Sequence, residues 1–249
     1  MKTTKIALFI AVIFFAASCK KDEVKPTSSL DNASLSLASQ SEIVTPPTGL
    51  SNSTDSHAEM AASWIESVNQ MTSYTAYMKP PSGAVKSTTK ITAKNGRVAT
   101  AGDSETWTWT DGQGNSVGYQ VSETTDSYVF DVFLKLAGQA DWLKYFHAEE
   151  KKDKSSGTMY ILNFDGTDPS AKILQYDWAL DGKLFTFKMT SDLDNIVINL
   201  TYHTDTKAGE VQYFVNSKLY YDMIWDTHGA GSWKLYKDDG VTLEDSGTW

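Results

Sequence analysis

The sequence of residues 184–203, LFTFKMTSDLDNIVINLTYH, contains two stretches in which apolar and polar residues alternate. In both stretches the apolar residues recur at every second position, which is the period of a β-strand with one buried face. Asp194-Asn195 lies between them, and such a dipeptide favours a tight turn. The stretch therefore predicts two antiparallel strands joined by a hairpin.

The same combination of alternating residues and turn signals recurs along the chain after Gly83. Trp107 and Trp109 alternate with threonines, and residues 219–225 place Leu, Tyr, Met and Trp on one side. Five dipeptides favour tight hairpin turns: Asn95-Gly96, Asp111-Gly112, Asp165-Gly166, Asp181-Gly182 and Asp239-Gly240. We expect an antiparallel up-and-down β-meander of about a dozen strands. A twisted sheet of that size tends to curl, so a curled sheet, a half barrel and a closed barrel are all open.

One amphipathic helix is expected before the strands. Ser56 and Glu59 have the spacing of a capping box. Apolar residues then follow at helical intervals: Ala61, Trp64, Ile65, Val68 and Met71. Pro80 and Pro81 exclude helix beyond Met78. The fold class predicted is mainly β, with an N-terminal amphipathic helix followed by the meander.

The N-terminus has the composition of a signal peptide. Lys2 and Lys5 precede an unbroken apolar run from residue 6 to residue 17, and small residues follow. The run is shorter than the roughly 20 residues that a membrane-spanning helix needs. Cys19 is the single cysteine of the chain, so it has no partner for an intramolecular disulfide. We expect residues 1–18 to be a secretory signal.

The stretch Phe15-Ala16-Ala17-Ser18-Cys19 resembles the lipobox of bacterial lipoproteins. The resemblance implies that the thiol of Cys19 is lipidated and that cleavage occurs just before it. Lys20-Lys21-Asp22-Glu23 is similar to the charged residues that follow the cysteine in surface lipoproteins of the Bacteroidota type. This likeness implies an outer-membrane lipoprotein exposed at the cell surface, with the periplasmic face as the alternative. Several acyl chains on one terminus would anchor the protein firmly.

Residues 20–55 differ in composition from the rest of the chain. Ser, Thr, Asn and Pro dominate, and no aromatic residue occurs. Such a segment offers little apolar surface to offset its chain entropy. We expect residues 19–55 to form the lipidated cysteine and a disordered tether, about 30–35 Å in mean extension. The single folded domain is then expected at residues 56–249.

The charge of the chain excludes nucleic acid as a partner. The formal net charge is −9, and removal of Lys2 and Lys5 with the signal peptide makes it −11. Arg97 is the single arginine. Proteins that bind nucleic acid neutralise many phosphates with clustered basic residues, and this composition does not supply them.

Sequence motifs for catalysis, metal binding or cofactor binding are missing. The four histidines, at positions 57, 147, 203 and 228, are too far apart for a His-x-x-x-His pair. Asp131, Asp177 and Asp222 lie opposite the aromatic side of their strands, where a carboxylate ordinarily faces solvent. We therefore expect no catalytic residues, no metal ligands and no cofactor, and the protein is not expected to be an enzyme.

Aromatic residues are the remaining candidates for ligand binding. Most tryptophans lie on the apolar side of their strands, where core packing is expected. Phe133, Tyr145 and Tyr220 lie on the other side or in strands of uncertain register. These three residues are the candidates for an exposed binding platform.

Three functions remain open. The first is a non-catalytic module of the cell envelope that binds a glycan or an envelope protein. The second is a carrier of a lipid-like ligand, because a helix followed by a meander resembles the element order of the lipoprotein carriers LolA and LolB. The third, less favoured, is a polysaccharide hydrolase that uses loop carboxylates. An element order alone does not transfer a function.

The lipoprotein interpretation makes a direct prediction for Cys19→Ser. The variant is expected to leave the membrane fraction and to lose metabolic labelling with palmitate, because the acylated thiol is gone. Fractionation and intact-mass measurement check this. A membrane-bound product with the mass of the unsubstituted protein would show that the interpretation is wrong.

Overall fold

The computed structural model describes residues 30, 33–35, 44–77, 79–94, 103–163, 168 and 171–249. Cys19, the signal peptide and the turns expected at Asn95-Gly96 and Asp165-Gly166 lie outside these residues. Within the described part of the chain, neither helix has the length and apolar character needed to cross a membrane.

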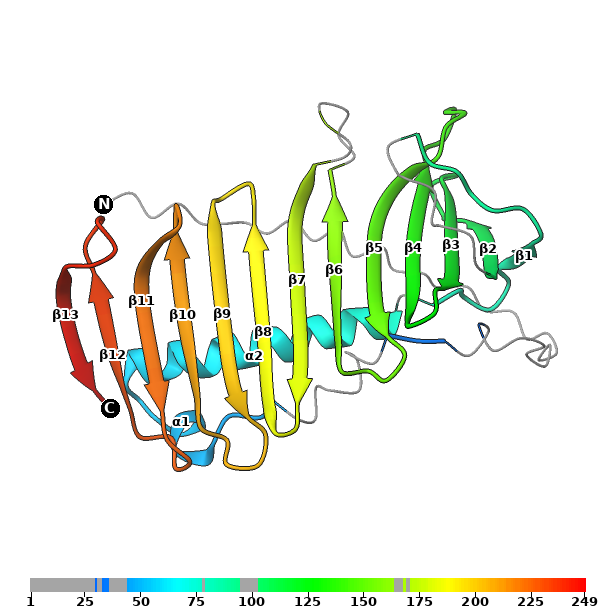
Figure 1. Ribbon diagram of the computed structural model, residues 1–249. Coiled ribbons are helices and arrows are strands. Elements are labelled where there is room, and N and C mark those ends of the chain that lie inside the picture. Colours follow the sequence, from blue (N-terminus) through cyan, green and yellow to red (C-terminus); the bar gives the residue numbers. More distant parts are fainter. Residues whose placement is uncertain are drawn as a thin grey trace.

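Thirteen strands form one antiparallel sheet in which each strand pairs with its neighbours in sequence (Figure 1). In order they are β1 Val85–Ser87, β2 Ser104–Thr110, β3 Ser116–Glu123, β4 Ser127–Lys135, β5 Leu143–Lys151, β6 Ser156–Leu162, β7 Lys172–Asp181, β8 Leu184–Ser191, β9 Ile196–His203, β10 Gly209–Val215, β11 Lys218–Trp225, β12 Gly231–Tyr236 and β13 Leu243–Thr248. β1 and β13 lie at opposite ends of this order, so the sheet is open. The predicted mainly β, up-and-down meander is confirmed, and the closed barrel is not formed.

Helix α2, Ser56–Tyr77, runs across the strands on one side of the sheet, which we call the inner face (Figure 1). Asp55, rather than Ser56, caps this helix: its Oδ1 accepts hydrogen bonds from the backbone N–H groups of His57 at 2.8 Å and Ala58 at 3.3 Å. The expected cap was therefore one residue too late. Aspartate is as good an N-cap as serine, because its carboxylate also accepts from the first free amides.

The core lies between α2 and the inner face. The helix contributes Ala58, Ala61, Ile65 and Val68, all of them buried. Paired residues of neighbouring strands share a face, and one inner-face row runs through Val121, Phe130, Ala148, Met159, Tyr176, Met189, Ile198, Tyr213, Tyr221 and Leu235. Trp64 stacks on Tyr213 at 6.1 Å, which places the helix directly on this row.

Cross-strand pairs of glycine and tryptophan complete the inner face. Gly157 pairs with Trp178, and a Cβ on Gly157 would lie 2.2 Å from the indole. Gly209 pairs with Trp225 in the same way, at 2.5 Å. The indole rings thus lie over the neighbouring strand, and glycine is needed there because any side chain would collide with them. This packing accounts for aromatic residues near the hairpins of the meander.

Part of the segment expected as a tether packs on the domain. Leu30, Leu35, Val44 and Leu50 are buried in the main core, and residues 48–51 form the short helix α1, Thr48–Ser51. The Tyr202 hydroxyl donates to the Thr45 carbonyl at 2.6 Å. The folded part therefore extends N-terminal of the boundary expected at residue 56. The average composition of residues 20–55 did not predict this packing. A few apolar residues spaced among many polar ones are enough to fill the space beside the helix.

Leu50→Ala is expected to lower the free energy of unfolding by about 2–5 kcal/mol, because it leaves a cavity in the core. Thr54→Ala, four residues away and exposed, is expected to change it by less than about 0.5 kcal/mol. Urea denaturation of both variants checks this. Equal midpoints for the two variants would mean that residues 44–55 do not contribute to the fold.

Candidate functional site: the outer face of the sheet

The side of the sheet opposite α2, which we call the outer face, carries a continuous row of polar side chains. The pairing register aligns one residue from each strand between β5 and β13. This polar row consists of Glu149, Thr158, Asp177, Lys188, Asn199, Gln212, Asp222, Lys234 and Ser246. Neighbouring strands are about 4.8 Å apart, so the row is about 38 Å long.

Hydrogen bonds along the strands hold several of these side chains in place. The Gln175 amide donates to Asp177 Oδ1 at 2.9 Å and accepts from Lys172 Nζ at 2.8 Å. On β10, the Gln212 amide donates to Glu210 Oε1 at 2.8 Å. Because both ends of each such bond are on the outer face, the row presents side chains whose orientations are partly fixed.

Glu210 and Asp222 form a pair of carboxyl groups in mutual contact on β10 and β11. Burial raises the pKa of Glu210, and the negative charge of Asp222 raises it further. Asp222 Oδ1 and Thr158 Oγ1 are buried oxygens of the polar row that have no hydrogen-bond partner among the described residues. Among those residues no cluster of three or more His, Cys, Asp or Glu could hold a metal ion.

A second outer-face row, next to the first, contains aromatic and apolar residues. His147 stacks on Tyr160 with ring centroids 4.7 Å apart. Lys172 Nζ lies 4.3 Å from the centroid of the Tyr160 ring. Burial raises the pKa of Tyr160, and the charges of Asp131 and Glu149 add to this effect. Further along the row, half-buried Val197 pairs with Phe214.

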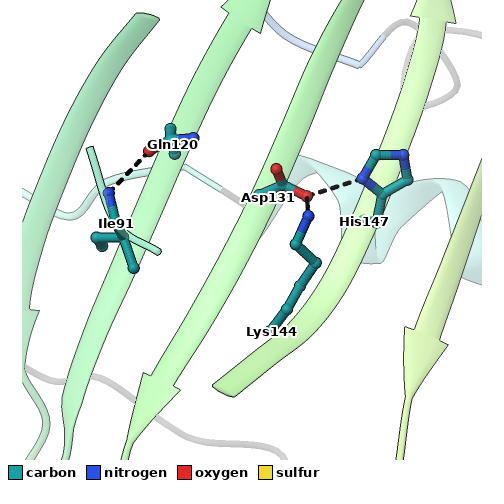
Figure 2. A network of polar contacts seen from close by, with 5 residues as sticks. All are labelled: Ile91, Gln120, Asp131, Lys144 and His147. Atoms are coloured by element: carbon teal, nitrogen blue, oxygen red, sulfur yellow. Dashed lines mark hydrogen bonds and ion pairs between the residues drawn. The ribbon is translucent and has the colours of Figure 1, made fainter. Parts of the chain in front are cut away.

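Beneath His147 lies a buried network of charged groups (Figure 2). Asp131 Oδ1 is 2.8 Å from Lys144 Nζ and 2.8 Å from His147 Nδ1. The side chain of Asp131 is 1% exposed and that of Lys144 is 7% exposed. The expectation that Asp131 faces solvent is therefore wrong. Asp177 and Asp222, by contrast, remain partly exposed.

Residues 91–93, which follow β1, cover the part of the outer face beside this network. Ile91 and Ala93 form a small second core with Phe133 and Trp142. The backbone N–H of Ile91 donates to Gln120 Oε1 at 3.1 Å (Figure 2). No periodicity within the strands signals such a covering segment, since it lies in a loop of the predicted meander.

The three aromatic residues that the sequence suggested for ligand binding lie in different environments. Phe133, 2% exposed, lies in the small second core, so its ring does not face solvent. Tyr145 on β5 packs against the main core, and burial raises its pKa. Tyr220 on β11 is 41% exposed and meets Tyr213 edge-on at 6.1 Å. They form no common platform, and ligand binding by any of them stays a prediction.

The polar row and the His147–Tyr160 pair were not identified from the sequence. Most of their residues, such as Asp177, Lys188, Asn199 and Gln212, lie between two apolar residues, which is the ordinary solvent side of a strand. Only the register of the strands shows that they align. The signal that was available is the regular occurrence of amide, hydroxyl and charged groups at these positions on successive strands.

The chain matches no protein-family model, and no curated protein matches its sequence. The structure by itself defines the class of fold: an open antiparallel meander with a helix packed on one face and a row of polar side chains on the other.

The buried network should matter for stability. Asp131→Asn is expected to lower the free energy of unfolding by about 3–5 kcal/mol, because it removes the carboxylate that compensates a buried ammonium. Asp141→Asn serves as the matched control, since Asp141 forms an exposed ion pair with Lys94 at 3.4 Å. Exposed pairs contribute about 0–1 kcal/mol. Thermal or urea denaturation measures both variants, and a similar small loss for each would contradict the assigned role of Asp131.

Proposed function

We propose that the chain is a lipid-anchored lipoprotein of the outer membrane whose β domain binds a glycan on the outer face of its sheet, without catalysis. The observation that carries this proposal is the polar row across β5–β13. Sugars expose many hydroxyl groups, and they are recognised by fixed side-chain donors and acceptors. The row offers one such side chain on each of nine successive strands.

The direction of the polar row favours a linear glycan. A polymer laid across the strands would meet a polar side chain about every 4.8 Å. The adjacent row adds the half-buried aromatic ring of Phe214, on which a sugar ring can stack. Such a ligand could contact the open face without entering a pocket.

A protein partner on this face is the less favoured alternative. The centres of protein interfaces are depleted in Lys, Glu and Asp and enriched in large apolar side chains. The polar row contains five charged residues: Glu149, Asp177, Lys188, Asp222 and Lys234. Desolvating them against another protein would cost free energy unless each charge found a matched partner.

The carrier and the hydrolase are supported less by the geometry. A lipid carrier needs an apolar cavity, but side chains of α2 and the side chains of Leu30, Leu35, Val44 and Leu50 pack in one core with the inner face. A glycosidase needs two carboxyl groups about 5–10 Å apart around the scissile bond. Glu210 and Asp222 are in direct contact instead.

Attachment to the membrane is part of the proposal. Cys19 would carry the lipid, and the basic and acidic residues at positions 20–23 support the outer membrane as its location. A sheet with one free polar face suits a protein held beside a layer of envelope glycans. Exposure on the cell surface is favoured, and the periplasmic side is the alternative.

Affinity gel electrophoresis of residues 20–249 in gels containing starch, xylan, mannan or galactan tests the proposed binding. At least one polysaccharide is expected to retard the chain. Asn199→Ala/Gln212→Ala is expected to weaken that binding at least about fivefold, because two hydrogen bonds of about 0.5–1.5 kcal/mol each are lost.

The matched control is Gln113→Ala/Gln139→Ala, which removes two exposed amides from loops outside the polar row. It should bind like the unsubstituted chain. Retardation by none of the polysaccharides would overturn the proposed glycan binding. Equal loss in both double variants would place the binding elsewhere on the protein.

A further inference from the structure

His147 is held from below by a carboxylate that is itself buried. Its Nδ1 lies 2.8 Å from Asp131 Oδ1, and the same oxygen lies 2.8 Å from Lys144 Nζ. An ionised carboxylate only accepts hydrogen bonds, so Nδ1 carries a proton and donates a hydrogen bond to Asp131. With Asp131 and Lys144 both charged, a neutral imidazole leaves the network without net charge.

The other ring nitrogen of His147 is then an acceptor. In a neutral imidazole with a proton on Nδ1, Nε2 has a free lone pair. Figure 2 shows this second nitrogen on the side of the ring that faces away from Asp131 and Lys144. The side chain of His147 is 17% exposed, whereas that of Asp131 is 1% exposed. The imidazole is therefore partly accessible, whereas the carboxylate that holds it is not.

The ring is also fixed laterally. It stacks on Tyr160 with an interplanar angle of 29°. Lys172 lies over the Tyr160 ring and donates to Gln175, which donates to Asp177 of the polar row. A chain of contacts thus connects His147 on β5 to the polar row on β7. This gives His147 both a set orientation and a place beside the proposed ligand path.

We propose that His147 is a ligand-contacting residue of the outer face, whose Nε2 accepts a hydrogen bond from a glycan hydroxyl. Asp131 is a positioning residue, because it selects the tautomer in which Nε2 is the acceptor. Tyr160 is a second positioning residue, because its ring stacks on the imidazole and fixes the plane of that ring. The inference rests on the proposed glycan binding and specifies which residues of the outer face anchor the ligand.

Two substitutions of His147 separate the two ring nitrogens. The amide of asparagine replaces Nδ1, and the longer side chain of glutamine reaches the position of Nε2. His147→Asn is expected to weaken binding about five- to tenfold, because one hydrogen bond is lost. His147→Gln is expected to keep binding within about threefold of the unsubstituted chain. The probe is the polysaccharide, among starch, xylan, mannan and galactan, that retards the unsubstituted chain most.

The control is His228→Asn, which changes an exposed histidine of the β11–β12 turn and should leave binding unchanged. If none of the four polysaccharides binds the unsubstituted chain, the proposed function fails and this inference fails with it. If one binds and His147→Asn binds as tightly as the unsubstituted chain, this inference alone is overturned. Greater loss in His147→Gln than in His147→Asn would also overturn it.

Nitrogen-15 NMR of the unsubstituted chain tests the role of Asp131 without a variant that could fail to fold. The His147 resonances should show a proton on Nδ1 and none on Nε2, and addition of the polysaccharide should shift Nε2. A proton on Nε2 with bare Nδ1 would overturn the assigned tautomer. An Nε2 resonance that does not respond to a bound polysaccharide would overturn the contact.

Discussion

The rest of the structure depends on covering the inner face of a single-layer sheet. Thirteen strands at about 4.8 Å spacing span about 58 Å, whereas the 22 residues of α2 extend about 33 Å. One helix therefore cannot bury the whole apolar face. Residues such as Val44 and Leu50 add to the cover, and large indole rings pack over glycines of neighbouring strands. The inner face of the sheet is thus covered by a helix, by packed residues of the N-terminal segment and by its own tryptophan rings.

Because the helix and the N-terminal segment cover only the inner face, the side chains of the outer face stay aligned from β5 to β13. The register shifts in the sheet fall between Val132 and Phe133, Ile161 and Leu162, Tyr213 and Phe214, and Leu235 and Tyr236. None of these shifts interrupts the polar row, which stays aligned from β5 to β13. A one-residue slip would exchange the two faces, so the buried inner row fixes the outer row as well.

The sequence predicted the elements and not their alignment. Alternation in residues 184–203 was enough to place strands β8 and β9, and the prolines at positions 80 and 81 correctly limited the helix. Alternation also placed Asp131 on the outer face, but it carries no information on whether another segment covers that face. Ile91 and its neighbours do so, and they lie in a loop without periodicity. The packing of Val44 and Leu50 was concealed for a related reason, since isolated apolar residues in polar chain show no period.

The buried charges of Asp131 and Lys144 beside His147 are the clearest feature of the fold that stability does not explain. A buried ion pair gives little net stability, and well-packed apolar residues of similar volume are often as stable or more so. Phe133 and Ile91 show that the same region also packs apolar side chains. Stability alone thus gives no reason to place Asp131 and Lys144 there. Proteins tend to depart from the rule that buried positions are apolar where function requires a group in one orientation. A network that fixes one imidazole at the edge of an open polar face meets that condition.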